Sequence, residues 1–171
     1  MMSFKHFTQF AAAIVLAALA TSAQAQTAQR PGLTLDGAKA IAAAAGAEAR
    51  RLGAGGAIAI VDEGGNLLYL ERLENTFPAA AVVAIDKART AATFRKPTRD
   101  FENAIAKGRT ALVAVDVMTP LQGGVPILVA GQVVGAIGVS GAMSAQQDDD
   151  IATLAAGSLG GGNSPSAAST R

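Results

Sequence analysis

Residues Gly123–Gly141 read GGVPILVAGQVVGAIGVSG, and this stretch decides the fold class. Two β-rich runs, Val125–Val129 and Val133–Val139, flank a turn centred on Gly131, which can take the positive φ that a tight hairpin requires. Two glycines lie inside the second run, Gly135 and Gly138. A glycine inside a strand usually marks a bulge or a close approach to the backbone. The stretch therefore predicts an antiparallel hairpin that carries one of these features.

The chain before this hairpin predicts a helix and a second hairpin. Apolar residues fall on one helical face between Leu35 and Leu52, with Thr34 as the expected N-cap and Gly53 as the stop. A strand is expected at Ala57–Val61, a turn at Asp62–Asn66 and a returning strand at Leu67–Arg72.

The intervening chain predicts more helix. Pro78 suits the first position of a long helix that runs to about Phe94, and Pro97 ends that helix. A short helix is expected at Asp100–Lys107, started by Thr98 or Asp100, and another strand at Thr110–Val117. The expected last helix runs from Ser144 to Ala156, with Asp148, Asp149 and Asp150 placed favourably for its dipole.

Adjacent strands joined by tight turns indicate an antiparallel sheet with helices packed on it, which is an α+β architecture in a single domain. No G-x-G-x-x-G sequence follows a first strand, so the sequence does not support a dinucleotide-binding fold.

The N-terminus has the features of a secretory signal. Lys5 and His6 form a short basic start, Phe10–Ala20 is apolar, and Ala23-Gln24-Ala25 is an A-x-A cleavage signal. The apolar run is short for a membrane span, although an uncleaved anchor is the alternative. Cleavage after Ala25 predicts a periplasmic or secreted protein with no stable membrane insertion. Residues 26–33 then form a polar lead-in, residues 34–159 the folded domain, and residues 160–171 a disordered Gly/Ser/Ala tail.

Removing these 25 of 171 residues leaves 146, the size of one ordinary domain. Without Lys5 the chain has 13 basic and 13 acidic residues, so its charge does not favour nucleic acid or anionic membranes as partners. His6 is the only histidine, and the sequence contains no cysteine. The cleaved chain therefore lacks the usual nucleophile–base pairs and the ligands of zinc and iron–sulfur sites, and no metal site is expected.

Five features occur in order along the chain: Ile60–Leu67, Arg72, Lys87–Ala91, Pro97-Thr98 and the glycine-rich hairpin. Together they resemble the GlcG/HbpS family of haem-binding and haem-degrading proteins, which is related to the C-terminal domain of PduO-type proteins. The resemblance extends from about Leu33 to about Leu159. It implies a profilin-like sheet flanked by helices, haem as the cofactor, and homo-oligomers that include octamers.

The resemblance also implies which residues contact a cofactor. In some family members a threonine of the long helix lies next to the haem iron, and Thr90 is the matching residue here, with Thr93 one turn away. Lys87 is expected to pair with an acid such as Asp62 or with a ligand carboxylate. Histidine, the iron ligand of some relatives, is not available after cleavage.

Haem requires an apolar slot, cations for two propionates and usually an axial ligand. Arg72 can offer its guanidinium to a propionate, and the amides of Gly123-Gly124 can hold an anion or simply permit close packing. Common axial ligands are restricted to Tyr69, Met118 and Met143, each of which can instead be a packing residue. The candidate cofactor-binding residues are Arg72, Lys87, Thr90, Tyr69, Met118, Gly123 and Gly124.

Two other functions remain open at the level of sequence. An isomerase or lyase acting on a small carboxylic acid would use Asp62 or Glu63 as acid or base, with Arg72 and Lys87 holding the carboxylate. Both acids can equally be turn residues. The third possibility is an oligomeric scaffold or sensor accessory. A basic rim is expected around the end of the long helix, formed by Arg89, Arg95, Lys96 and Arg99.

Overall fold

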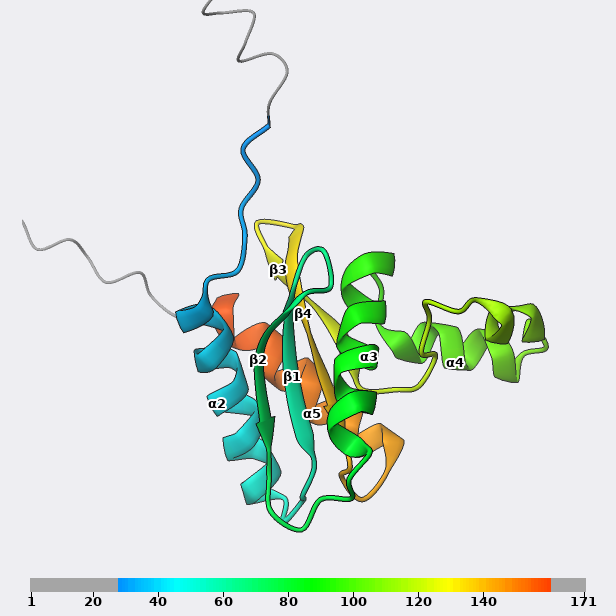
Figure 1. The fold of residues 1–171 in the computed structure, drawn as a ribbon, viewed down its shortest axis with the longest axis horizontal. Helices are drawn as coiled ribbons and strands as arrows, with labels where there is room; N and C mark the ends of the chain where they lie inside the picture. Colours follow the sequence, from blue (N-terminus) through cyan, green and yellow to red (C-terminus); the bar gives the residue numbers. More distant parts are fainter. Residues whose placement is uncertain (1–27, 161–171) are drawn as a thin grey trace, which may run out of the picture. The chain divides into compact units, whose positions relative to one another are not determined.

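The sheet joins two hairpins that lie far apart in the sequence. The computed structural model describes residues 28–160, so the predicted signal peptide and residues 161–171 of the predicted tail lie outside the described residues. The strands are β1 (Ala57–Asp62), β2 (Leu67–Arg72), β3 (Gly124–Val129) and β4 (Gln132–Ser140). Their order is β2-β1-β4-β3 and every neighbouring pair is antiparallel (Figure 1). The predicted antiparallel α+β architecture is confirmed.

Helices cover both faces of the sheet (Figure 1). On one face α2 (Leu35–Arg51) and α5 (Ala145–Gly157) pack against a core that includes Ile58, Ile60 and Ile137. On the other face α3 (Ala80–Phe94) packs against a second core formed mainly by alanines. The alanines on α3 and on the strands that it covers let the helix approach the sheet closely.

The glycine-rich hairpin forms as predicted. Ala130 and Gly131 have φ of 49° and 77°, which is the positive-φ pair of a tight hairpin turn. The register shifts by one residue between Ile127 and Leu128, so β4 carries a bulge close to Gly135. A Cβ on Gly138 would overlap the carbonyl oxygen of Ala84 and lie 2.7 Å from the Ala88 nitrogen. Both expected features, a bulge and a close contact, therefore occur in β4.

The predicted helix signals are partly correct. Thr34 Oγ1 accepts a hydrogen bond from the Gly37 amide at 3.1 Å and caps α2, and Gly53 follows its last turn with φ 64°. The prediction that Pro78 is the first helical residue is wrong, because a turn at residues 78–79 precedes α3 and Ala79 is its N-cap. Arg95 closes α3 in the left-handed conformation.

The predicted strand at Thr110–Val117 is also wrong. After α4 (Thr98–Ala106), residues Thr110–Ala114 form the 3₁₀ helix η1, which packs on α4 rather than on the sheet. Figure 1 shows α4 and the chain after it projecting beyond α3, and the described sheet consists only of β2, β1, β4 and β3. Short-range turns satisfy this backbone instead, among them the Val115 amide bonded to the Leu112 carbonyl.

Among residues 28–160, no helix is both long enough and apolar enough to cross a membrane.

Candidate functional site

Lys87 lies in the middle of α3 with its side chain only 4% exposed. Its ammonium group makes an ion pair with Asp148 Oδ2 at 3.0 Å and donates a hydrogen bond to the Val139 carbonyl at 3.0 Å. Asp148 Oδ1 accepts from the Ala142 amide at 2.9 Å. The prediction that Lys87 pairs with an acid is confirmed, but Asp62 is not that acid. The partner comes from α5, about sixty residues further along the chain than Lys87.

The acidic run of α5 does more than complement the helix dipole. Asp149 is completely buried and forms an ion pair with Arg99 of α4. Its Oδ1 has no hydrogen-bond partner among the described residues. Arg99 is therefore not a free member of a solvated basic rim. Asp148 attaches α5 to α3, which covers the other face of the sheet, and Asp149 attaches α5 to α4.

The glycine pair at the start of β3 lies beneath these helices. A Cβ on Gly124 would overlap the Lys87 carbonyl and lie 2.6 Å from Thr98 Cγ2. The Gly124 amide donates to Thr98 Oγ1 at 2.8 Å, and Gly123 is buried with φ 111°. The close-packing interpretation of these glycines matches this geometry. An anion could use the Gly124 amide only if Thr98 moved away.

Thr90 faces the chain that returns from η1 to β3. Its hydroxyl donates to the Asp86 carbonyl at 2.8 Å and accepts from the Thr119 amide at 2.8 Å. The residue is 1% exposed. Because the hydroxyl is buried and bonded to Thr119, Thr90 as a neighbour of haem iron stays a prediction that requires the Thr119 segment to move.

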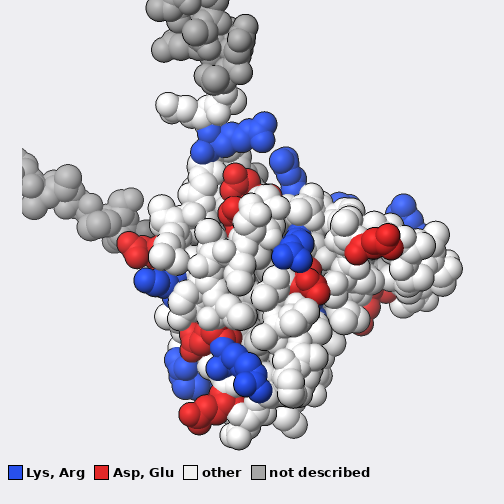
Figure 2. All heavy atoms as spheres, in the orientation of Figure 1, with Lys and Arg blue, Asp and Glu red and all other residues white. Residues whose placement is uncertain are grey.

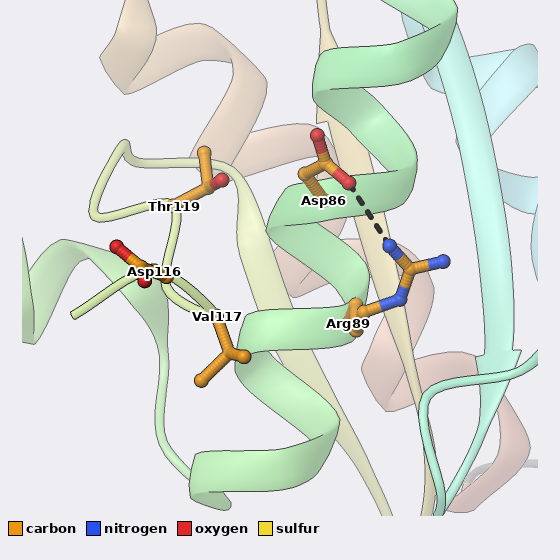
Figure 3. A pocket seen from close by; sticks show the side chains of 5 residues that line it. All are labelled: Asp86, Arg89, Asp116, Val117 and Thr119. Carbon is orange, nitrogen blue, oxygen red and sulfur yellow. Dashed lines mark hydrogen bonds and ion pairs between the residues drawn. The ribbon is translucent and has the colours of Figure 1, made fainter.

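A hollow of about 230 Å³ is lined by Thr119, whose amide bonds Thr90, and by four other residues. Figure 3 shows Asp116, Val117 and Thr119 on the returning loop and Asp86 and Arg89 on α3. The guanidinium of Arg89 bonds Asp86 at 3.2 Å and the Gly65 carbonyl at 3.4 Å. Met118 lies between two residues that line the hollow and is half-buried. Arg89 thus lines the hollow, Met118 adjoins it in the chain, and the buried Thr90 hydroxyl bonds the wall residue Thr119.

The other predicted residues lie elsewhere. Asp62 Oδ1 accepts from the amides of Gly64 and Asn66 at 2.9 and 2.8 Å, as expected for a turn residue. Burial alone would raise the pKa of the Asp62 carboxyl, but hydrogen bonds from the Asn66 side chain and the turn amides outweigh burial and hold that pKa below its ordinary value. Arg72 donates to the Thr76 carbonyl. Asp62, Arg72 and Lys87 therefore do not surround one pocket, and Glu63 is exposed on the same turn.

Tyr69 packs against the core under α2 and α5, whereas Thr90 and Lys87 belong to α3 on the opposite face. Tyr69 and Thr90 thus cannot contact one ligand from the same side of the sheet. A second hollow of about 300 Å³ is lined by Arg50, Ala54, Leu73 and Glu74, none of which the sequence singled out.

Sequence reasoning missed Asp86, Val117 and Thr119, which line the hollow beside Thr90. No local pattern points to Thr119, because its role comes from a main-chain amide that meets a helix 29 residues earlier in the chain. Among the described residues, no group of three or more His, Cys, Asp or Glu side chains is placed to hold a metal ion. On the face seen in Figure 2, basic and acidic side chains are interspersed, without a large patch of one sign.

Comparison with known proteins agrees with this architecture. The family model described as "Haem degrading protein HbpS-like" matches residues 33–156. This chain belongs to the HbpS-like family. Protein GlcG of Escherichia coli K12 is 46% identical over 103 residues, which is 60% of this chain and 77% of GlcG. An uncharacterised 15.0 kDa Citrobacter freundii protein is 32% identical over 127 residues, covering 72% of this chain and 89% of that protein.

Solved structures of the family share the fold. A crystal structure of HbpS superposes with a TM-score of 0.73 at 31% identity, covering 81% of this chain and 96% of that one. The Klebsiella pneumoniae protein ORFY gives a TM-score of 0.74 at 27% identity, covering 80% and 97%. A haem complex of PduOC, at 24% identity and a TM-score of 0.66 over 74% and 94% of the two chains, shares the fold.

Proposed function

We propose that this chain is an exported haem-binding protein of the GlcG/HbpS type that captures, stores or degrades haem. The observation that carries the proposal is the match of a family described as haem-degrading to nearly the whole folded part. The surroundings of the hollow between α3 and the returning loop support it, because Arg89 lines the hollow, Met118 adjoins it in the chain, and the buried Thr90 hydroxyl bonds its wall residue Thr119. When bound, haem would supply the redox and oxygen chemistry, while the protein supplies binding and orientation.

The described residues contain neither histidine nor cysteine, so the common axial ligands that they offer are hydroxyl oxygens and thioethers. Thr90 and Met118 are the candidates beside the hollow, and Arg89 is the cation best placed for a propionate. Tyr69 would have to act from the other face. Met143, 83% exposed, lies on the loop between β4 and α5.

The hollow is too small to hold haem. Pockets for drug-sized ligands occupy about 300–1,000 Å³. The hollow beside Thr90 measures about 230 Å³, too little to enclose a tetrapyrrole. Haem binding at this position therefore requires either movement of the returning loop or a surface supplied by a second copy of the chain. A homo-oligomer, with octamers implied by the family resemblance, is part of the proposal.

Export is the other part. The proposal rests on the basic start, the apolar run and the A-x-A signal of residues 1–25, and it locates the protein in the periplasm or outside the cell. An oxidising compartment would pose no difficulty for this chain, because it has no cysteine to oxidise.

No described contact favours the carboxylic-acid enzyme. That function needs Asp62, Arg72 and Lys87 around one pocket, and each is committed to a different partner. We therefore propose no acid–base step for Asp62 or Glu63.

The proposal is tested by titrating residues 26–171 with haemin and recording absorption spectra. Three variants identify the neighbour of the iron: Thr90→Ala and Met118→Leu on the α3 side, and Tyr69→Phe on the opposite face. Met143→Leu is the matched control for loss of a thioether. We expect a stoichiometric Soret shift that weakens in an α3-side variant and persists in Tyr69→Phe and Met143→Leu. A spectrum that remains that of free haemin at micromolar protein would refute haem binding.

A further inference from the structure

The chain between η1 and β3 is weakly attached to the rest of the protein. No residue from Arg99 to Gln122 is fully buried. We call residues Val115–Leu121 the flap. Two of its apolar side chains are exposed, Val117 at 70% and Leu121 at 47%, and the others are only half-buried. Segments with few buried apolar contacts open locally at low free-energy cost.

A single hydrogen bond joins the flap to α3 in the described structure, and it runs from the Thr119 amide to Thr90 Oγ1. The other main-chain bonds of the flap are local turns, for example from the Met118 amide to the Val115 carbonyl. Just past the flap, the Gln122 amide donates to Glu102 Oε2 at 2.6 Å and the buried Gly123 begins the packed region. The weakly bonded stretch therefore lies between η1 and Gln122.

Opening the flap would change two properties of the α3 surface at once. It would free the acceptor side of the Thr90 hydroxyl, which is 1% exposed while the flap is closed. It would also remove one wall of the hollow, because Asp116, Val117 and Thr119 all belong to the flap. Opening would therefore let a single chain admit a ligand too large for the hollow of about 230 Å³.

We propose that Val115–Leu121 is a flap that opens from α3 to admit a flat apolar ligand to Thr90, with the Thr119 amide–Thr90 hydroxyl bond as its latch. The identity of the ligand rests on the proposed haem function. The opening of the flap does not, since it follows from contacts within the haem-free chain.

Amide hydrogen exchange of haem-free residues 26–171 tests the opening. In the wild type we expect residues 115–121 to exchange much faster than the buried part of α3. Thr90→Val removes the latch acceptor at nearly constant volume and should speed exchange of the flap roughly three- to tenfold, the size of one net hydrogen bond. Thr90→Ser keeps the hydroxyl, and Thr119→Ala keeps the amide, so both should retain the exchange rates of the wild type.

Thr119→Pro removes the donating amide and leaves Thr90 intact. It tests the latch independently if Thr90→Val unfolds the whole domain. Faster exchange confined to the flap supports the latch. Exchange of residues 115–121 as slow as that of α3, or unchanged flap exchange in both Thr90→Val and Thr119→Pro, overturns it.

Haemin added to the same samples tests the ligand part. We expect haemin to slow exchange in residues 115–121 and 86–90, and to associate faster with Thr119→Pro than with the wild type. Haemin that binds while protecting only other segments would overturn the proposed entry route. If haemin does not bind at all, the proposed function fails, and the haem-free exchange rates still decide whether the flap exists.

Discussion

At the residue scale, the buried pair of Lys87 and Asp148 matters for stability mainly because neither charge is left buried without a partner. Lys87→Met would leave the carboxylate of Asp148, whose side chain is 8% exposed, without its counter-ion. Breaking such a pair from one side costs about 3–5 kcal/mol. We expect a loss of that size in the free energy of unfolding, measured by urea denaturation.

Two variants serve as comparisons for Lys87→Met. Arg51→Ala removes the partner of Glu48 from an exposed pair and should cost less than about 1 kcal/mol. The double variant Lys87→Met/Asp148→Leu removes both charges and should recover much of the loss. A loss below about 1 kcal/mol for Lys87→Met alone would contradict the structural role of the pair.

Asp62 gives a pH-dependent prediction. Its pKa is lower in the folded protein than in the unfolded chain, so its contribution is present above the unfolded pKa of about 3.9 and is lost as pH falls through the folded pKa. Asp62→Asn should lower the free energy of unfolding at pH 7 by about 1–2 kcal/mol, the worth of hydrogen bonds to a charged group. The difference from the wild type should shrink towards pH 3.

Urea denaturation at several pH values checks the Asp62 prediction. Glu63→Gln, an exposed change on the same turn, is the control and should leave stability nearly unchanged at each pH. A difference between Asp62→Asn and the wild type that stays constant down to pH 3 would show that charge on Asp62 does not stabilise the turn.

At the scale of elements, the contact between α3 and β4 depends on a missing side chain. A Cβ on Gly138 would meet backbone atoms of Ala84 and Ala88, which no rotamer change can relieve. Gly138→Ala should therefore force α3 away from the sheet and destabilise the domain by about 3 kcal/mol or more. Thermal unfolding would show this as a large fall in Tm.

Gly157→Ala is the matched control for Gly138→Ala. This glycine ends α5, a Cβ added to it would have no atom within 4 Å, and its φ is not positive. Alanine is the better helix former, so Tm should stay the same or rise slightly. Equal Tm values for the two variants would mean that α3 is not held on β4 as closely as described.

At the scale of the whole molecule, export and assembly are the properties to measure. The full-length chain produced in a Gram-negative bacterium should appear in the periplasmic fraction with the mass of a protein that begins at Gln26. Intact-mass spectrometry of that fraction decides the cleavage site. An unprocessed chain retained with membranes would support the uncleaved-anchor alternative.

The haem titration also depends on assembly, because a second copy could supply the surface that the small hollow lacks. Sedimentation velocity of residues 26–171, with and without haemin, measures this directly. We expect a homo-oligomer before haemin is added. A monomer that binds haemin stoichiometrically would leave opening of the flap as the route by which one chain makes room for the ligand.

Local sequence patterns were sufficient for most of the fold. The two hairpins, α2 with its Thr34 cap, and α5 follow from periodicity, turn residues and capping residues, all of which act over a few positions. Glycines within β4 correctly indicated a bulge and a close approach. The same patterns failed at Thr110–Val117, because an apolar β-branched run forms a strand only where a sheet edge is available to pair with it.

Tertiary structure alone decided the partners. Lys87 meets Asp148, Arg99 meets Asp149, and Thr90 meets the amide of Thr119, each across dozens of residues. Composition and spacing indicate that such polar groups need partners, but they do not determine which distant residue is the partner. That choice is made when helices and strands pack, because burial leaves each charge or hydroxyl only the few neighbours that the fold brings within hydrogen-bond distance.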